Sequence, residues 1–364
     1  MVPDRALYAL DVMQDGMEDS GFGLLLRGLG GPFEKINAAP ILSGIFSKSG
    51  IKTLGQFMLD NGFTTKYKLS IKPSKKRPSG VPKRYIYLVS AYDYPSQWEN
   101  LTDSQRLEKL TTIRMELVKL GKDSGDMIPF SFWPDTIIFK EMGNPLSIAD
   151  YLDLNRKEMM AKIIMVQGEQ STRPETGLKS CSPSFLQGFA TIVNGENMAA
   201  GTNREFLRSR GFVGYNGFRS LGDVFTDTLH YTINKLGLAL DAYKHILTPL
   251  ESRLMEKHPH HQLLKHIKQS CRNLIIDGPN CVIGVLPDQT MFMLQDRNKL
   301  LQGIVGTDNG TYVFSSDISG LDATLPKRDM RMDFQPMHMD IVFVGPERKQ
   351  ICVYRQTDPL QLPN

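Results

Sequence analysis

The sequence has few cysteines, no long apolar run and little net charge, and each shortage argues against a class of protein. Its four cysteines, Cys181, Cys271, Cys281 and Cys352, are far apart and form no Cys-x-x-Cys pair. We therefore expect neither a disulfide framework nor a cysteine zinc site, and a reducing cytoplasm is the expected location. No apolar run reaches the roughly 18 residues that a membrane-spanning helix needs.

Charge and composition point to an ordinary globular protein. The net charge is +4, from 43 basic and 39 acidic side chains that are interspersed. This bias is too weak to predict binding to nucleic acid or to an anionic membrane. The first residues are acidic and mixed, unlike a signal peptide. With 364 residues, 41% of them hydrophobic, the chain is long enough to bury a full core.

The order of predicted elements indicates an α+β fold. A helix capped by Thr102 or Asp103 and closed by Gly121 precedes a strand-rich stretch from about 132 to 193. Residues 223–268 are helical in pattern, and the last hundred residues are short strands with turn signals. This order favours antiparallel sheets packed against helices over a parallel βαβ series. No internal repeat is visible, and the length allows one large domain or two.

Two further stretches have competing interpretations. Residues 66–84, KYKLSIKPSKKRPSGVPKR, are basic and are expected to form a solvated loop or hairpin arm, with a docking surface for an acidic partner as the alternative. The histidines of HPHHQLLKH (258–266) invite a metal site, but their spacing fits no standard ligand pattern. We expect a solvated entry to a helix there, and no metal.

An apolar run that ends in Asn194-Gly195 raises a question about function, since Asn-Gly usually marks a tight turn. The stretch FLQGFATIVNGENMAAGTNREFLRSRG resembles the glutaminase domain of glutamate synthases, in which a strand ends in Asn-Gly before a helix bearing Asn-Arg. The same domains resemble this chain at three further motifs: Asp277-Gly278-Pro279, Asp296-Arg297-Asn298 and Ser316-Asp317. The early stretch ALDVMQDGMEDSGFG also looks like a helix end of class II glutamine amidotransferases. Most of the chain is thus similar to a stand-alone bacterial and archaeal form of this domain.

The resemblance implies a fold, a reaction and a partner. The fold would be an N-terminal-nucleophile hydrolase-like four-layer α/β/β/α sandwich of two antiparallel sheets, in a single domain over residues 1–364. The reaction would be hydrolysis of the glutamine side-chain amide, with glutamine as the ligand and no cofactor in this chain. The ammonia would pass to a glutamate-synthase-like subunit that carries flavin and an iron–sulfur cluster.

The resemblance also implies roles for particular residues, and several positions depart from the family. The Asn194 side chain and the Gly195 backbone N–H would stabilise the oxyanion. The family's nucleophile is an N-terminal cysteine activated by its own amine, whereas Met1 is followed by Val2 and no cysteine precedes Cys181. The substrate-binding positions are then filled as follows: Glu169 where an arginine is expected, with Thr172 and Arg173 nearby, and Ser220, Leu221 and Asp223 where a carboxylate turn is expected, Leu221 replacing the aspartate.

These departures predict weak binding of free glutamine. Glu169 would repel the carboxylate that an arginine attracts, and Leu221 would leave the substrate ammonium without a counter-ion, at a cost of several kcal/mol. We expect Glu169, Asn194 and Leu221 to line a common cavity. Three interpretations stay open: a degenerate glutaminase-like subunit, an active enzyme whose Met-Cys start lies upstream, and a module in which Glu169 selects a cationic amino acid.

Cys181 is the one cysteine close in sequence to the Asn-Gly strand. It has neither a terminal amine nor a neighbouring histidine in the sequence to activate it. Interior cysteines are most often small buried hydrophobes, and this is the role that we expect for Cys181.

Overall fold

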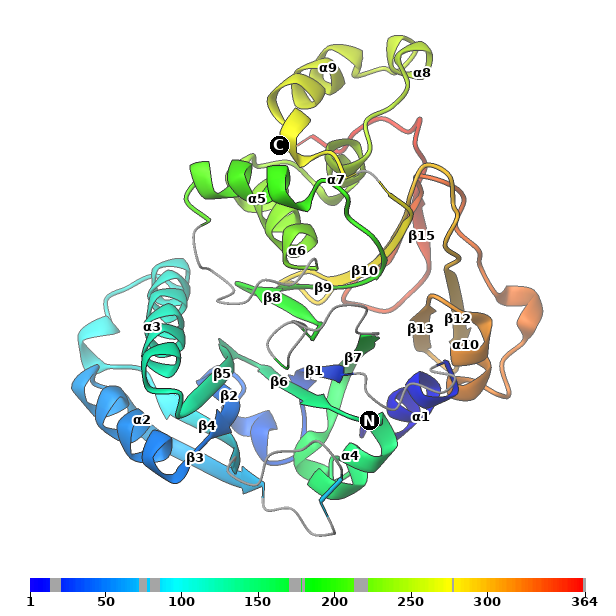
Figure 1. The fold of residues 1–364 in the computed structure, drawn as a ribbon. Coiled ribbons are helices and arrows are strands. Elements are labelled where there is room, and N and C mark those ends of the chain that lie inside the picture. The colour runs from blue at the N-terminus through cyan, green and yellow to red at the C-terminus, as the bar shows by residue number, and fades with distance from the viewer. Residues whose placement is uncertain are drawn as a thin grey trace. The chain divides into compact units, whose positions relative to one another are not determined.

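The computed structural model describes residues 1–13, 21–71, 77–78, 86–169, 178, 181–212, 222–276 and 278–362. These residues form two compact units: the first comprises the described residues of Met1–Pro183, and the second those from Ser184 to the C-terminal end. Figure 1 traces the elements of each unit. Among the described helices, none is long and apolar enough to cross a membrane.

The first unit contains two antiparallel sheets. Its three-stranded sheet has the order β6-β1-β7, with β1 at Gly21–Leu29, β6 at Thr136–Met142 and β7 at Ala161–Glu169. Its four-stranded sheet has the order β3-β4-β2-β5, with β2 at Pro40–Phe46, β3 at Thr64–Ile71, β4 at Ile86–Asp93 and β5 at Met127–Pro134. The helices are α1 (Asp4–Met13), α2 (Lys48–Asp60), α3 (Asp103–Ser124) and α4 (Pro145–Leu152), with the short 3-10 turns η1 (Gly31–Ile36), η2 (Ser96–Trp98) and η3 (Lys157–Met159).

Helices α2 and α3 cover one face of the four-stranded sheet (Figure 1). An aromatic cluster lies between these helices and the sheet. In this cluster the Phe63 ring contacts Tyr92, Trp98 and Phe132 edge to face. Edge-to-face pairs of this kind add stability beyond the area that they bury. The cluster therefore fixes how the helices seat on the sheet.

Helix α3 begins where the sequence predicts and ends later. Thr102 and Gln105 form a capping box at its start. The predicted end at Gly121 is wrong, because the helix runs on to Ser124 and stops at Gly125, whose φ is 69°. Gly121 lies inside the helix. Glycine is required there because the backbone of Met127 occupies the space that a side chain would need. Its smallness serves packing, whereas Gly125 supplies the left-handed end.

The predicted basic segment begins within β3, which contains residues 66–71, and continues into the connection between β3 and β4. These two strands pair antiparallel, and Lys66 at its beginning forms an ion pair of 2.9 Å with Asp93 across them. Most of the residues between the strands lie outside the described part of the chain. Whether they form a docking surface stays a prediction.

The second unit is built on a six-stranded antiparallel sheet of order β15-β14-β11-β10-β9-β8. Its strands are β8 (Ser184–Leu186), β9 (Phe189–Gly195), β10 (Asn280–Val285), β11 (Met291–Gln295), β14 (Ile341–Val344) and β15 (Cys352–Tyr354). A separate hairpin pairs β12 (Ile304–Asp308) with β13 (Thr311–Ser315).

The helices of the second unit are α5 (Ala200–Ser209), α6 (Asp223–His230) with its π-helical extension η5 (Tyr231–Lys235), α7 (Leu240–Leu247), α8 (Ser252–Glu256), α9 (His261–Ser270) with the 3-10 turn η6 (Arg272–Leu274), α10 (Ile318–Thr324) and the 3-10 turn η7 (Met330–Met332). In this unit α6 packs on β8 and β9 and α5 packs on α6, whereas α10 and η7 lie beside the β12–β13 hairpin (Figure 1). Both units thus combine helices with antiparallel sheets, which confirms the predicted α+β class. The single domain over 1–364 and the four-layer stacking stay predictions.

The histidine-rich stretch before α9 differs from the prediction in one respect. His261 and His266 are exposed, but His258 is buried and its Nε2 bonds the backbone oxygen of Asp358 at 2.8 Å. The prediction of a solvated entry is therefore wrong for His258, because the sequence does not reveal that residues near the C-terminus pack against it. Within the described ranges, no three potential ligands are placed to hold a metal ion.

Gly21 and Gly23, at the start of β1, lie where another segment of the chain passes very close to the strand. The segment Cys181–Pro183 passes over β1, so that a Cβ on Gly23 would overlap the backbone of Ser182 and one on Gly21 would meet the Cys181 sulfur. Lys140, paired with Gly23 across the sheet, donates from its buried Nζ to the Cys181 carbonyl oxygen. Gly21 and Gly23 are thus required by packing.

We predict that Gly23→Ala lowers the free energy of unfolding by about 2 kcal/mol or more, because the new methyl group must displace backbone atoms of Ser182. Urea denaturation measures this. The matched control is Gly55→Ala in α2, where a Cβ would meet nothing within 4 Å and should raise stability by about 0.5–1 kcal/mol. Equal effects of the two changes would contradict the close crossing.

Candidate functional site

Asn194 and Gly195 are the last residues of β9, beside the first residues of β10. Asn194 lies opposite Cys281, and Gly195 lies opposite Asn280. Asn194 is exposed, and no atom of the described chain accepts or donates a hydrogen bond at its side-chain amide. The strand end therefore presents a free amide to whatever approaches it.

Two glycines bring this strand end close to the start of β10. Gly195 has a φ of 139°, and a Cβ on it would lie 2.6 Å from the Cα of Asn280. Gly278 has a φ of 125°, and a Cβ there would lie 2.9 Å from the Glu196 oxygen. Between them the Glu196 N–H donates to the Pro279 oxygen at 3.0 Å. We call residues Asn194–Glu196 and Gly278–Asn280 the Asn-Gly corner.

The Asp296 carboxylate holds the corner from the side of β11. Its Oδ2 accepts the Asn280 N–H at 2.9 Å, and its Oδ1 accepts the N–H groups of Asn298 and Lys299 at 2.6 and 2.8 Å. Asp296 is buried, and so is its bond to the Asn280 N–H, whereas the two bonds to Asn298 and Lys299 are partly buried. Hydrogen bonds to a charged acceptor are among the stronger ones in proteins.

The corner thus unites three motifs that are far apart in the sequence. Asn194-Gly195 touches Gly278-Pro279, which is tied in turn to the Asp296–Asn298 turn. Asp277 itself lies outside the described residues. The motifs that carry the resemblance to glutaminase domains therefore meet in one place of this unit.

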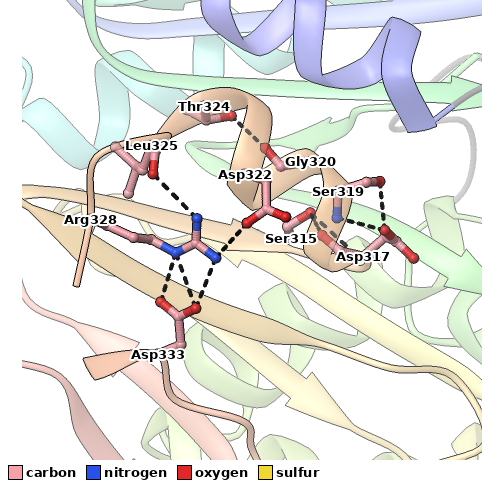
Figure 2. Close-up of polar contacts among 9 residues, drawn as sticks. All are labelled: Ser315, Asp317, Ser319, Gly320, Asp322, Thr324, Leu325, Arg328 and Asp333. Atoms are coloured by element: carbon pink, nitrogen blue, oxygen red, sulfur yellow. Dashed lines mark hydrogen bonds and ion pairs between the residues drawn. The ribbon is translucent and has the colours of Figure 1, made fainter. Parts of the chain in front are cut away.

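The remaining motif, Ser316-Asp317, has a structural role at the start of α10. Figure 2 shows the Asp317 carboxylate accepting from the Ser319 N–H at 2.7 Å and from its hydroxyl at 2.6 Å. Ser315 donates to the Asp317 backbone oxygen at 2.7 Å. Asp317 is therefore the N-cap of α10.

A buried arginine fixes the segment that follows α10. The Arg328 guanidinium forms an ion pair with Asp333 at 2.8 Å and another with Asp322 at 2.7 Å, and it also donates to the Leu325 oxygen (Figure 2). Its side chain is only 1% exposed, which is tolerable because its charge is matched and its donors are bonded. The hydrogen bonds to Asp333 raise the pKa of Arg328 further, so it stays charged.

Side chains on one face of helix α6 form hydrogen bonds with the β8–β9 hairpin. Asp223 accepts from the Ser184 hydroxyl at 2.9 Å, the hydroxyls of Thr226 and Thr191 lie 2.6 Å apart, and His230 bonds the Gln187 side chain at 2.6 Å. The three helical positions are three and four residues apart, which places them on one side of the helix. Asp223 is buried here and helps to seat β9, the strand that ends in Asn194.

Asn203 also supports the corner, although the sequence marks it only as part of the Asn-Arg motif. Fully buried in α5, it donates from Nδ2 to the backbone oxygens of Asn273 and Ile275 at 2.7 and 3.2 Å. It therefore ties the helix that follows the corner to the segment that leads back into it. The signal in the sequence is a polar residue between Ala200 and Leu207, both of which are buried.

The other predicted site residues have these positions. Glu169 is the last residue of β7, opposite Gly21, and only its main chain is described. Thr172, Arg173, Ser220 and Leu221 lie outside the described residues. The common cavity of Glu169, Asn194 and Leu221 therefore stays a prediction, as does substrate binding by Asp223. Cys181 is 3% exposed, which agrees with a small buried hydrophobe.

Comparisons with known proteins return distant structural similarities only. No protein-family description and no curated protein match the chain. One solved structure is the allosteric regulatory enzyme of purine biosynthesis, at 14% identity and a TM-score of 0.40. Another is the glutamine phosphoribosylpyrophosphate amidotransferase from B. subtilis complexed with ADP and GMP, at 15% and 0.37. Each alignment covers 60% of this chain and 40% of the other. Values this low assign no activity to this chain.

We predict that Asp296→Ala lowers the free energy of unfolding by about 3 kcal/mol, because one buried and two partly buried N–H groups lose a charged acceptor. Urea denaturation checks the value. The control is Asp288→Ala, which removes an exposed carboxylate that accepts from the Thr290 N–H and hydroxyl and should cost about 1 kcal/mol or less. A loss at Asp296 no greater than at Asp288 would contradict its role in the corner.

We also predict that His230 makes stability depend on pH. Burial, with a smaller contribution from Lys235, lowers the pKa of His230 from 6.5 to about 4. Between these values the unfolded chain takes up a proton that the folded chain does not, so stability is lost as the pH falls.

The loss from pH 7 to 4.5 that is due to His230 should be about 2 kcal/mol. His230→Phe should lose that much less than the parent protein over the same range, as measured by urea denaturation at both pH values. His266→Phe, at an exposed position, should keep the parent's dependence. A parent-like dependence in His230→Phe would refute the assignment.

Proposed function

We propose that this chain is a glutaminase-type subunit of the class II glutamine amidotransferase kind, related to glutamate synthase and impaired in glutamine hydrolysis. The observation that carries the proposal is the Asn-Gly corner. Asn194-Gly195, Gly278-Pro279 and Asp296-Asn298 resemble one family's motifs separately, and their contact supports reading them as one site.

The chemistry of amide hydrolysis supports a role for the corner. Attack on a side-chain amide places negative charge on its oxygen, and fixed donors must await that charge. Asn194 offers an exposed amide that has no partner in the described chain. Its position is fixed by a strand end that Gly195 and Asp296 hold in place. A donor held in this way needs little reorganisation during the reaction.

The identity of two residues supports the impairment. The resemblance assigns the substrate carboxylate to the position of Glu169 and the substrate ammonium to that of Leu221. A carboxylate at the first position repels its ligand, and leucine at the second provides no counter-charge. Free glutamine should therefore bind weakly.

A subunit that binds glutamine weakly can still serve a complex. We propose that it acts as the partner or regulatory subunit of a glutamate-synthase-like protein with flavin and an iron–sulfur cluster. This part of the proposal rests on the resemblance of the sequence motifs. Glutamine binding is the part of the proposal that substitutions in this chain can test most directly.

We predict that the parent protein binds L-glutamine with a Kd above about 10 mM and releases no glutamate from it. Exchanging the two residues for the family's types, in Glu169→Arg with Leu221→Asp, should tighten binding at least about tenfold, or 1.4 kcal/mol. Isothermal titration calorimetry measures the affinity, and a coupled assay measures glutamate release.

The matched control is Glu116→Arg with Leu300→Asp, which makes the same changes at exposed positions. It should bind glutamine as weakly as the parent. Glutamate release by the parent protein would contradict the impairment while supporting the glutaminase assignment. A double variant that folds but gains no affinity would contradict the assignment of Glu169 and Leu221 to a glutamine site.

A further inference from the structure

Helix α9 and the turn after it lack acidic side chains altogether. No aspartate or glutamate occurs between Glu256 and Asp277, while lysine, arginine and histidine recur throughout this stretch. A balanced chain thus has one strongly unbalanced segment. The glutaminase proposal gives this segment no role.

Three of the basic residues of α9 lie on one side, whereas His266 lies on another. His261, Lys265 and Lys268 follow one another at intervals of four and three residues, which is the spacing of a single helical stripe, and Arg272 follows in the turn η6. We call these four residues the basic face of α9. Leu264, Ile267 and Cys271 point to another side and are buried. The helix is therefore seated by its apolar side and leaves the basic face to solvent.

The part of the chain that the structure describes does not neutralise the lysine and arginine charges of the basic face. Within the described residues, no carboxylate lies within salt-bridge distance of Lys265, Lys268 or Arg272. Elsewhere in the same unit Arg328 is paired with Asp333, and Arg355 with Asp340. Like charges on one helix side repel one another and cost stability unless a counter-charge arrives.

We propose that the basic face of α9 docks an acidic surface of a protein partner. The part of the face on α9, from His261 to Lys268, spans about 10 Å along the helix axis, so carboxylates at helical spacing on a partner can meet its charges in turn. Lys265 and Arg272 are exposed, and Arg272 can grip a carboxylate with two parallel bonds. This inference is independent of the glutaminase proposal.

Two other classes of ligand fit the face less well. A membrane-surface helix inserts its apolar side, and here Leu264 and Ile267 are buried inside the unit. Single-stranded nucleic acid is bound mainly through large aromatic side chains on which bases stack, and α9 and η6 contain no Phe, Tyr or Trp. The chain's pI of about 8.7 also falls short of the value above about 9 that is typical of nucleic-acid-binding domains.

The test measures binding of the full chain to fluorescein-labelled poly-L-glutamate by fluorescence anisotropy at low and physiological salt. We expect binding that weakens with salt and that falls about tenfold or more in the variant Lys265→Glu, Lys268→Glu, Arg272→Glu. The control variant Lys48→Glu, Lys119→Glu, Lys122→Glu makes the same charge change on α2 and α3 of the other unit. It should retain most of the affinity. Circular dichroism confirms that both variants fold.

Labelled poly(U) and phosphatidylserine-containing vesicles complete the test. The proposal expects both to bind the parent protein more weakly than poly-L-glutamate. Tighter binding of poly(U) would replace the acidic partner by nucleic acid, and tighter binding of vesicles would replace it by a membrane surface. Equal losses in the two charge-reversal variants would show an effect of net charge alone and would overturn the docking face.

Discussion

The close approach of two backbone segments at the Asn-Gly corner is the constraint on which the candidate site depends. Gly195 and Gly278 permit the approach because neither carries a side chain, and the buried Asp296 carboxylate holds the Asn280 end in place. Sterics and a charged hydrogen-bond acceptor thus act together. The result is a strand end that is rigid in its backbone and yet leaves the Asn194 amide free.

Two helices of the second unit, α5 and α6, form hydrogen bonds that hold the segments leading to the corner. Helix α6 grips the β8–β9 hairpin through Asp223, Thr226 and His230, and α5 reaches the returning chain through Asn203. These are buried polar contacts, which favour one arrangement because any other would leave polar groups without partners. Among the described residues, α9 contributes no polar contact to the corner, and its basic face is the part to which we assign another molecule.

The sequence predicts elements better than it predicts the partners of side chains. The class of fold and the Thr102 cap follow from periodicity and local capping chemistry, and the structure confirms them. The end of α3 is misplaced at Gly121, because both Gly121 and Gly125 look like helix ends until tertiary packing distinguishes them. The role of Asp296 is visible only in three dimensions, since its partner Asn280 precedes it by a whole hairpin. The resemblance supplies residue types for the site, but not the contacts that hold them.

The central claim is that the corner is a single rigid assembly, and native-state hydrogen exchange of the parent protein tests it most directly. The amide protons of Glu196, Asn280 and Asn298 donate to Pro279, Asp296 and Asp296 respectively. If they belong to one cooperative unit, they should exchange with one common free energy of opening, close to that of global unfolding. Exchange of Glu196 at the rate of an open surface turn, while Asn280 stays protected, would contradict the account.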